Sequence, residues 1–319
     1  MSELLALLSP LWVLPLGMGA LFVGLLFKGV DRIVVARLQR RIGPPLLQPF
    51  YDIAKLMQKR SMVPEPAMTG LFLYLPAAGV CAMMVAVALV PIPGMYQPPQ
   101  ALGDLLVLLY LLAVPAIVIM LAGSASGSTF GAIGFSREMS LMLAYEGPLL
   151  LVLISVAIRT GAGLGEPISL SLNEVVAWQQ GHGAFITDPL MWPALLAFLS
   201  VIPANLGVAP FDIPEAESEI LEGPLLEYSG PALAMFKLMS TLKTMLVLSL
   251  GVVMFWPSVG EGLWPLLTHL LKCLGLFLLA KTALRASVGR MRMDQAFIFY
   301  FKWPELLGVL SLILVVATV

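Results

Sequence analysis

The sequence predicts an all-α integral membrane protein with about eight transmembrane helices and one amphipathic surface helix. Hydrophobic residues make up 59% of the 319 residues and charged residues only 12%. The mean hydropathy of +0.95 lies far above that of soluble domains. A bilayer core takes roughly 20 apolar residues per helix, and about eight such runs occur, near 8–30, 69–92, 103–122, 136–159, 188–207, 230–255, 263–284 and 304–319. Because the runs are continuous, they favour helices over a β-barrel.

The first run is about 23 residues long and precedes a basic cluster, which is typical of a retained transmembrane helix and not of a signal peptide. Most of the 18 Lys and Arg residues fall on one side of the membrane if the N-terminus lies outside, and such residues favour cytoplasmic loops. We therefore expect a single multi-pass domain, 1–319, in the cytoplasmic membrane, with both termini outside. The expected cytoplasmic loops lie at about 31–67, 123–135, 208–229 and 284–303.

The loop after the first run contains the expected surface helix. The Gly43-Pro44-Pro45 turn breaks the chain, and apolar residues then recur at helical spacing opposite Asp52 and Lys55. Such a helix suits the membrane surface, where it either anchors the chain or forms the lip of a docking site. The docking candidates of this loop and of the last basic loop are Arg37, Arg40, Arg41, Asp52, Arg292 and Asp294.

Between the second and third runs and after the fourth run, the outer loops 91–103 and 160–187 are rich in Gly, Pro and Ser and predict simple connectors. His182 in the second loop is expected to be solvated. Cys81 and Cys273 lie in apolar runs without CxxC spacing, which indicates two buried small hydrophobic residues. No metal or cofactor site is expected in this chain.

Ionisable residues inside the apolar runs are the first candidates for function, because charges at bilayer depth are costly and mark ion routes. In the fourth run Glu138 and Glu146 are eight residues apart, about 80° around a helix, so both can face one interior seam. Glu138 can instead lie at the interface, and Glu146, before Gly147-Pro148, can instead mark a packing kink. In the sixth run Lys237 and Lys243 lie about 9 and 18 Å beyond Gly230. Buried lysines titrate readily, as a proton relay needs.

The stretch from Pro210 to Gly230, before the sixth run, contains six acidic residues and no Lys or Arg. Closely spaced carboxylates cannot all ionise, so part of this acidic loop should hold protons near neutral pH. The alternative is a solvated acidic face. The six residues are Asp212, Glu215, Glu217, Glu219, Glu222 and Glu227.

Four segments carry a family resemblance: ARLQRRIGPPLLQPFYDIAKL at 36–56, SREMSLMLAYE at 136–146, PFDIPEAESEILEGPLLEYSG at 210–230 and RMDQ at 292–295. Over nearly the whole chain the sequence resembles the membrane subunit that joins the hydrophilic arm of respiratory complex I to its proton-pumping arm. Gly223-Pro224 within EGPLLEYSG makes it more similar to the branch found in energy-converting [NiFe]-hydrogenases and formate hydrogenlyase.

The resemblance implies a subunit that has no redox centre of its own, docks a redox arm and couples its chemistry to H+ or Na+ movement. The implied partners are hydrogenase large and small subunits carrying a [NiFe] site and iron–sulfur clusters, a ferredoxin-like iron–sulfur subunit, antiporter-like membrane subunits and the lipid bilayer, with no nucleic acid. Two alternatives remain open. One is a membrane subunit that forms the quinone site of complex I, and the other is a passive anchor without an ion pathway.

Overall fold

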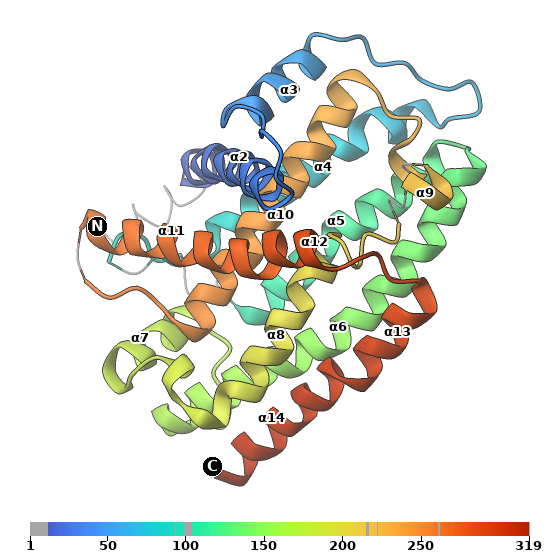
Figure 1. Cartoon of the computed structure of the whole chain (residues 1–319). Coiled ribbons are helices and arrows are strands. Elements are labelled where there is room, and N and C mark those ends of the chain that lie inside the picture. The colour runs from blue at the N-terminus through green and yellow to red at the C-terminus, as the bar shows by residue number, and fades with distance from the viewer. Residues whose placement is uncertain are drawn as a thin grey trace.

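The computed structural model describes residues 12–92, 94–98, 104–214, 217–221, 223–260 and 262–318, with the backbone alone at Glu217 and Ser218. Its α-helices are α2 (Val13–Leu38), α3 (Gln48–Met57), α4 (Thr69–Ala88), α5 (Leu105–Ala125), α6 (Thr129–Leu164), α7 (Leu172–His182), α8 (Trp192–Asn205), α9 (Glu217–Ile220), α10 (Gly230–Phe255), α11 (Leu263–Phe277), α12 (Leu284–Ser287), α13 (Met293–Lys302) and α14 (Pro304–Thr318). Shorter turns are η2 (Phe185–Thr187), η3 (Pro189–Met191), η4 (Gly223–Leu225) and the π-helical η5 (Leu278–Ala283). No strand occurs within these ranges (Figure 1).

Seven helices of the described chain are long and apolar enough to cross a membrane, and an eighth apolar helix, Pro189–Asn205, is shorter. The predicted fold class, an all-α integral membrane protein, is confirmed. The seven spans are Val13–Leu38, Thr69–Ala88, Leu105–Ala125, Thr129–Leu164, Gly230–Phe255, Leu263–Ser287 and Met293–Thr318.

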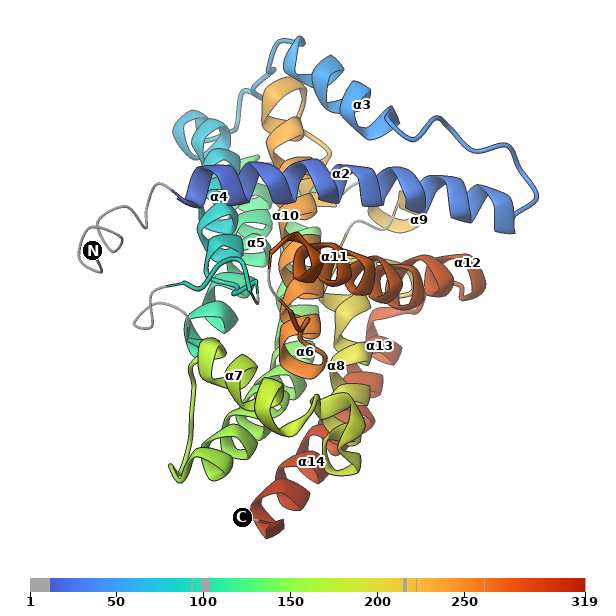
Figure 2. The ribbon, with the colours of Figure 1, turned by 90° about the vertical axis from the view of Figure 1, so that its left-hand side faces the viewer.

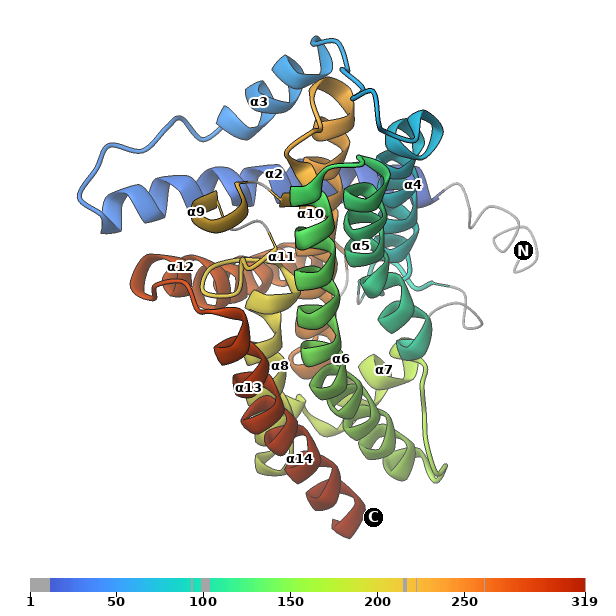
Figure 3. The ribbon, with the colours of Figure 1, turned by 90° about the vertical axis from the view of Figure 1, so that its right-hand side faces the viewer.

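Helix α10 is the centre of the bundle, and most of its residues are buried. It packs against α4, α2 and α11, while α14 packs on α6 and α8. Figure 2 shows α2 crossing the upright helices α4 and α10, and Figure 3 shows α13 and α14 as one nearly continuous rod at the edge of the bundle. Polar residues carried by several of these helices therefore meet around α10.

The helices extend beyond the apolar runs seen in the sequence. α2 continues to Leu38, α6 begins at Thr129, and the last span begins at Met293. The polar residues of α2 keep their helical geometry because they find partners: Arg32 donates to Asp52 of α3 at 2.7 Å, and Asp31 accepts from Thr282 at 2.8 Å. Charged residues that resembled loop residues in the sequence are thus integrated into helices.

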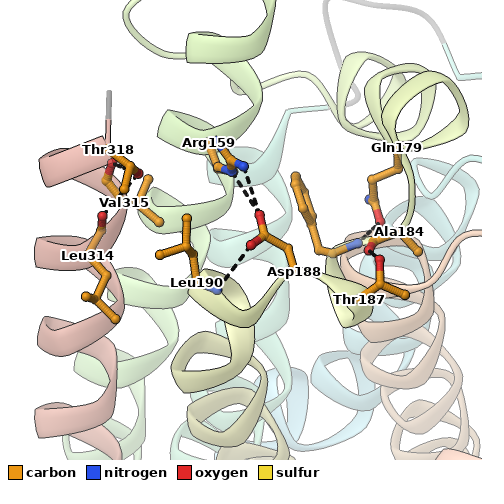
Figure 4. A network of polar contacts seen from close by, with 10 residues as sticks. Arg159, Gln179, Ala184, Thr187, Asp188, Leu190, Leu314, Val315 and Thr318 are labelled. Atoms are coloured by element: carbon orange, nitrogen blue, oxygen red, sulfur yellow. Dashed lines mark hydrogen bonds and ion pairs between the residues drawn. The ribbon is translucent and has the colours of Figure 1, made fainter.

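The predicted surface helix is present as α3, which is strongly amphipathic and packs on α2 and α10. The prediction that residues 160–187 form a simple connector was wrong. The segment folds into α7 and η2, and Arg159 of α6 is paired with Asp188 at 2.9 Å (Figure 4). The amide of Gln179, which is buried, donates to the carbonyls of Val253 and Met254. These carbonyls end α10 and lack helical partners, so a polar residue is required there.

The predictions for the two cysteines and for His182 had different outcomes. Cys273 is buried, as expected, but Cys81 of α4 is exposed. His182 is exposed, as expected, and its ring contacts the Trp178 carbonyl and stacks on the Trp178 ring.

Candidate functional site

A polar cavity of about 430 Å³ lies beside α10, where α2, α5, α6, η5 and α12 meet the segment 205–214. Ionisable groups at bilayer depth generally face such an interior space and mark ion routes. The charged residues of its wall come from α2, α6, the acidic loop, α10 and the residues that follow α11. They are Lys28, Glu138, Asp212, Lys243, Lys281, Arg285 and Arg290.

The cavity joins two groups that the sequence placed separately, the membrane charges and the acidic loop. Glu138 of α6 and Lys243 of α10 both line it, and Lys243 is only 7% exposed. Asp212, at the start of the acidic loop, lines the same space. A residue of the acidic loop and charged residues of α6 and α10 therefore line one space.

Two ion pairs hold the acidic loop in place. Arg290 donates to both carboxylate oxygens of Asp212, at 2.8 and 2.6 Å, and the Met291 N–H donates to the Pro210 carbonyl at 3.0 Å. Arg137 of α6 pairs with Glu219 of α9. Basic residues from α6 and from the segment before α13 thus border the acidic loop.

Pro224 fixes the loop against α5 and α6. A Cβ atom added to Gly134 would stand 2.4 Å from Cδ of Pro224, and one added to Gly123 would stand 3.2 Å from its Cβ. Gly223 has a φ of 51°, a left-handed conformation that glycine adopts without steric cost. Gly223-Pro224 therefore works as a packing element, in which the ring fills a notch made by two glycines.

The end of the acidic loop is buried and aromatic. Tyr228 is buried, stacks on Phe72 with ring centroids 4.0 Å apart, and donates to the Ala122 carbonyl at 3.4 Å. Burial raises the pKa of its hydroxyl. The Ser229 hydroxyl accepts from the Met62 N–H at 3.1 Å, so the end of the acidic loop contacts the end of the first charged loop.

Glu146 and Lys237 do not line the cavity. Glu146 is half-buried on α6, and both Glu138 and Glu146 lie within electrostatic range of Lys243. Lys237 is exposed on α10, and its carbonyl accepts from Lys28 at 3.3 Å. The two lysines of α10 thus have different surroundings.

The other sequence-predicted residues are placed as follows. Glu227 is half-buried. Glu215 and Glu222 lie outside the described residues, and so does the side chain of Glu217. The exposed candidates for docking a partner are Arg37, Arg40, Arg41, Arg292 and Asp294.

Asp52 differs from these docking candidates because its carboxylate is engaged within the chain. It accepts from Arg32 at 2.7 Å and from Gln48 at 2.9 Å. Partial burial pushes the pKa of Asp52 upward, but these hydrogen bonds and the charges of Arg32 and Lys237 outweigh burial and hold it below its usual value. Asp52 therefore attaches α3 to α2.

Sequence reasoning missed further charged residues at the cavity, which belong to α2, η5 and α12. Asp31 of α2 is 3% exposed and accepts from Thr282 at 2.8 Å and from Arg285 at 3.1 Å. Lys281 is buried next to Thr282, in the π-helical η5. π turns inside α-helices are frequent at functional sites. From the sequence, Asp31 and Arg285 fall in expected cytoplasmic loops, and Lys281 falls near the end of the apolar run 263–284.

In the described parts of the chain, no group of three or more His, Cys, Asp or Glu side chains is arranged to hold a metal ion. The site consists of carboxylates, lysines and arginines around a polar cavity. Such groups can bind, hold and release protons or small cations.

Comparisons with known proteins agree with this architecture. Residues 12–316 match the family described as NADH dehydrogenase. Hydrogenase-4 component C of Escherichia coli is 36% identical over 266 residues, covering 81% of each chain. Formate hydrogenlyase subunit 4 of the same organism is 33% identical over 277 residues, covering 84% of this chain and 87% of the relative.

Two further matches extend the comparison. A subunit of the NADH-quinone oxidoreductase of Dehalococcoides mccartyi is 30% identical over 303 residues, covering 91% of this chain and 81% of the relative. A chain in the structure of the membrane-bound sulfane sulfur reductase, an archaeal respiratory membrane complex, superposes with a TM-score of 0.86 at 31% identity, covering 96% of this chain and 99% of the other. By sequence over most of its length and by its fold, the chain belongs to the NADH dehydrogenase family.

Proposed function

We propose that this chain is the membrane-anchoring and coupling subunit of an energy-converting hydrogenase complex, where it links H2 chemistry in a docked redox arm to ion translocation. The observation that carries the proposal is the shared cavity. Its wall contains Glu138 and the buried Lys243 together with Asp212 of the acidic loop. The relatives hydrogenase-4 component C and formate hydrogenlyase subunit 4 support the hydrogenase assignment.

In this proposal the acidic loop faces the cytoplasm and is covered by the redox arm. The arm consists of hydrogenase large and small subunits and an iron–sulfur subunit, with the [NiFe] site and the iron–sulfur clusters. The exposed arginines after α2 and Arg292 and Asp294 at the start of α13 contact it. Both termini lie outside, and antiporter-like membrane subunits complete the complex.

Coupling follows from electrostatics. When the redox arm changes the protonation of an acidic-loop carboxylate, the field at Glu138 and Lys243 changes, and interacting ionisable groups titrate as one system. A proton bound at Glu138 is then released toward Glu146, on the same helix. Ion pairs such as Arg137–Glu219 hold the loop close enough for this field to act.

The quinone-reducing alternative has less support from the cavity. A quinone ring and its tail need a mainly apolar lining with a few polar groups, whereas charged side chains stand at seven positions of this wall. A second candidate comes from the match with the sulfane sulfur reductase complex. It keeps the same coupling role and replaces the hydrogenase arm with one that reduces sulfur compounds.

The test uses the whole complex reconstituted in lipid vesicles. We expect Lys243→Ala and Glu138→Gln to abolish H+ or Na+ uptake driven by H2 chemistry while the complex still assembles. The matched controls are Lys55→Ala and Glu166→Gln, whose side chains are exposed. Ion uptake that persists in the assembled Lys243 and Glu138 variants would favour a passive anchor, and a complex that neither makes nor consumes H2 would favour the sulfur-reducing candidate.

A further inference from the structure

Glu305 is an ionisable residue near the middle of the membrane span Met293–Thr318. The apolar run in the sequence begins at residue 304, so from the sequence Glu305 resembles a residue at the membrane edge. In the structure the apolar span begins at Met293, eleven residues before the start of that run. Glu305 therefore lies near the middle of the span. A carboxylate at this depth is costly unless it serves the bundle interior.

The carboxylate of Glu305 points toward α6. One of its oxygens lies 2.9 Å from where a Cβ atom on Gly147 would stand, and three residues further along the rod Gly308 packs on Leu151 in the same way. Glu305 is half-buried there. A Cβ atom at position 147 would require the Glu305 carboxylate to move away from the α6 backbone, and Gly147 directly follows Glu146.

Glu305 has no ion-pair or hydrogen-bond partner within the described chain. A structural role would require such a partner, because an unpaired charge in the bilayer destabilises the fold. A carboxyl that alternately binds and releases a proton does not require one. Among the described residues, the Glu305 carboxylate is therefore not committed to an ion pair or a hydrogen bond.

The neighbouring turn of α6 contains further polar groups without partners. The Tyr145 hydroxyl is buried and unpartnered among the described residues, its side chain is 2% exposed, and it lies within electrostatic range of Glu138 and Glu146. Pro148 lacks an N–H, so the Ala144 carbonyl loses its usual helical donor. Unpartnered polar groups of this kind bind water where space allows, and water transfers protons between carboxyls.

We propose that Glu305 accepts the proton that Glu146 releases, so that the path from the cavity continues through α6 and leaves the chain along the α13–α14 rod. In this step the Glu146 carboxylic acid loses its proton and the Glu305 carboxylate gains it, directly or through water, with no net change of charge. Tyr145 directly precedes Glu146 in α6, and its hydroxyl, which has no partner among the described residues, can bind that water. The inference rests on the proposed function and adds the residue through which the proton leaves this chain.

Two variants test Glu305 in the reconstituted complex, with H2 turnover and lumen acidification measured together. Glu305→Gln cannot carry a proton. It should therefore lower the number of protons moved per H2. Gly147→Ala keeps every charge but places a methyl group against the Glu305 carboxylate and displaces it. It should lower the same ratio, and the substitution favours the helix because alanine has a higher helix propensity than glycine.

Glu138→Gln and Glu166→Gln complete the set as the coupling and exposed-surface controls. Lost pumping in Glu138→Gln, Glu305→Gln and Gly147→Ala, with Glu166→Gln unchanged, supports the exit at Glu305. Normal pumping in both Glu305→Gln and Gly147→Ala while Glu138→Gln fails overturns this inference and leaves the proposed function intact. Normal pumping in Glu138→Gln as well overturns both. If Glu305→Gln does not assemble, Gly147→Ala decides.

Discussion

The notch that holds Pro224 provides a test of how the acidic loop is fixed to the bundle. In a Gly134→Ala variant the new methyl carbon would stand 2.4 Å from Cδ and 2.7 Å from Cγ of Pro224, whereas favourable carbon contacts lie at about 3.5–4.0 Å. Overpacking of this kind costs about 1–3 kcal/mol. Alanine in a helix recovers about 1 kcal/mol relative to glycine, so the net loss is about 0–2 kcal/mol.

The loop should give way before α6 does, because α6 packs along α5 and α14, whereas the loop is held by a few contacts. We therefore expect faster amide hydrogen exchange in residues 208–221, by up to about thirtyfold, since about 1.4 kcal/mol corresponds to tenfold. Exchange is measured by mass spectrometry on the intact complex. The ratio of protons moved to H2 turnover should fall in parallel.

Two further variants make this experiment decisive. Gly275→Ala lies in α11 with open space around its new methyl group and should leave exchange in the loop unchanged. In the double variant Gly134→Ala/Pro224→Ala, the ring atoms Cγ and Cδ that clash with the new methyl group are gone. The increase in loop exchange should therefore be smaller than the sum of the increases in the two single variants. The reasoning would be refuted if the effects of the two substitutions on exchange simply added. It would also be refuted if the loop of the Gly134→Ala variant exchanged as slowly as that of the unmodified chain.

Two further predictions concern α3 and the segment 172–187. Because the folded-state pKa of Asp52 lies below its usual value of about 3.9, its stabilising contribution is present above that value and disappears as the pH falls through the folded-state pKa. A nitroxide probe at Ala54→Cys on α3 should therefore become more mobile below about pH 4. Gln179→Leu leaves the Phe185 N–H without its acceptor and should destabilise the segment 172–187 by about 1–3 kcal/mol, measured by hydrogen exchange in this segment.

Matched controls exist for both predictions. Adding Asp52→Asn should make the probe mobile already at neutral pH, and an acid-induced change that survives this substitution would show that another group is responsible. For the segment 172–187, the control is Gln180→Leu. The Gln180 side chain is exposed, so its loss should be nearly neutral. Equal effects of the two glutamine substitutions would mean that the buried amide does not stabilise the end of α10.

The fold class could be predicted because each span depends mainly on local composition. Continuous apolar runs and the Gly43-Pro44-Pro45 break required no tertiary information. These features are encoded within short stretches of sequence.

Other parts of the site depend on contacts between distant segments. Lys281 lies near the end of an apolar run and resembles a loop residue, and its burial follows only from how η5 packs on α2. Asp31 and Arg285 are 254 residues apart. Similarly, the space beside Gly147 and Gly134 is filled by residues from other elements, and a single sequence contains no sign of which ones. The membrane depth of Glu305 depends on where its helix begins.

The π-helical turn η5 makes helix register, and not residue identity alone, a determinant of the cavity. A π turn contains one residue more than an α-helical turn, and each residue of an α-helix rotates the following side chains by about 100°. Arg285 reaches Asp31 from beyond this turn. Deleting one residue from Leu278–Ala283 would therefore swing Arg285 away while leaving the span almost unchanged in hydrophobicity. Insertions and deletions in this turn can thus add or remove basic side chains at the cavity in related chains.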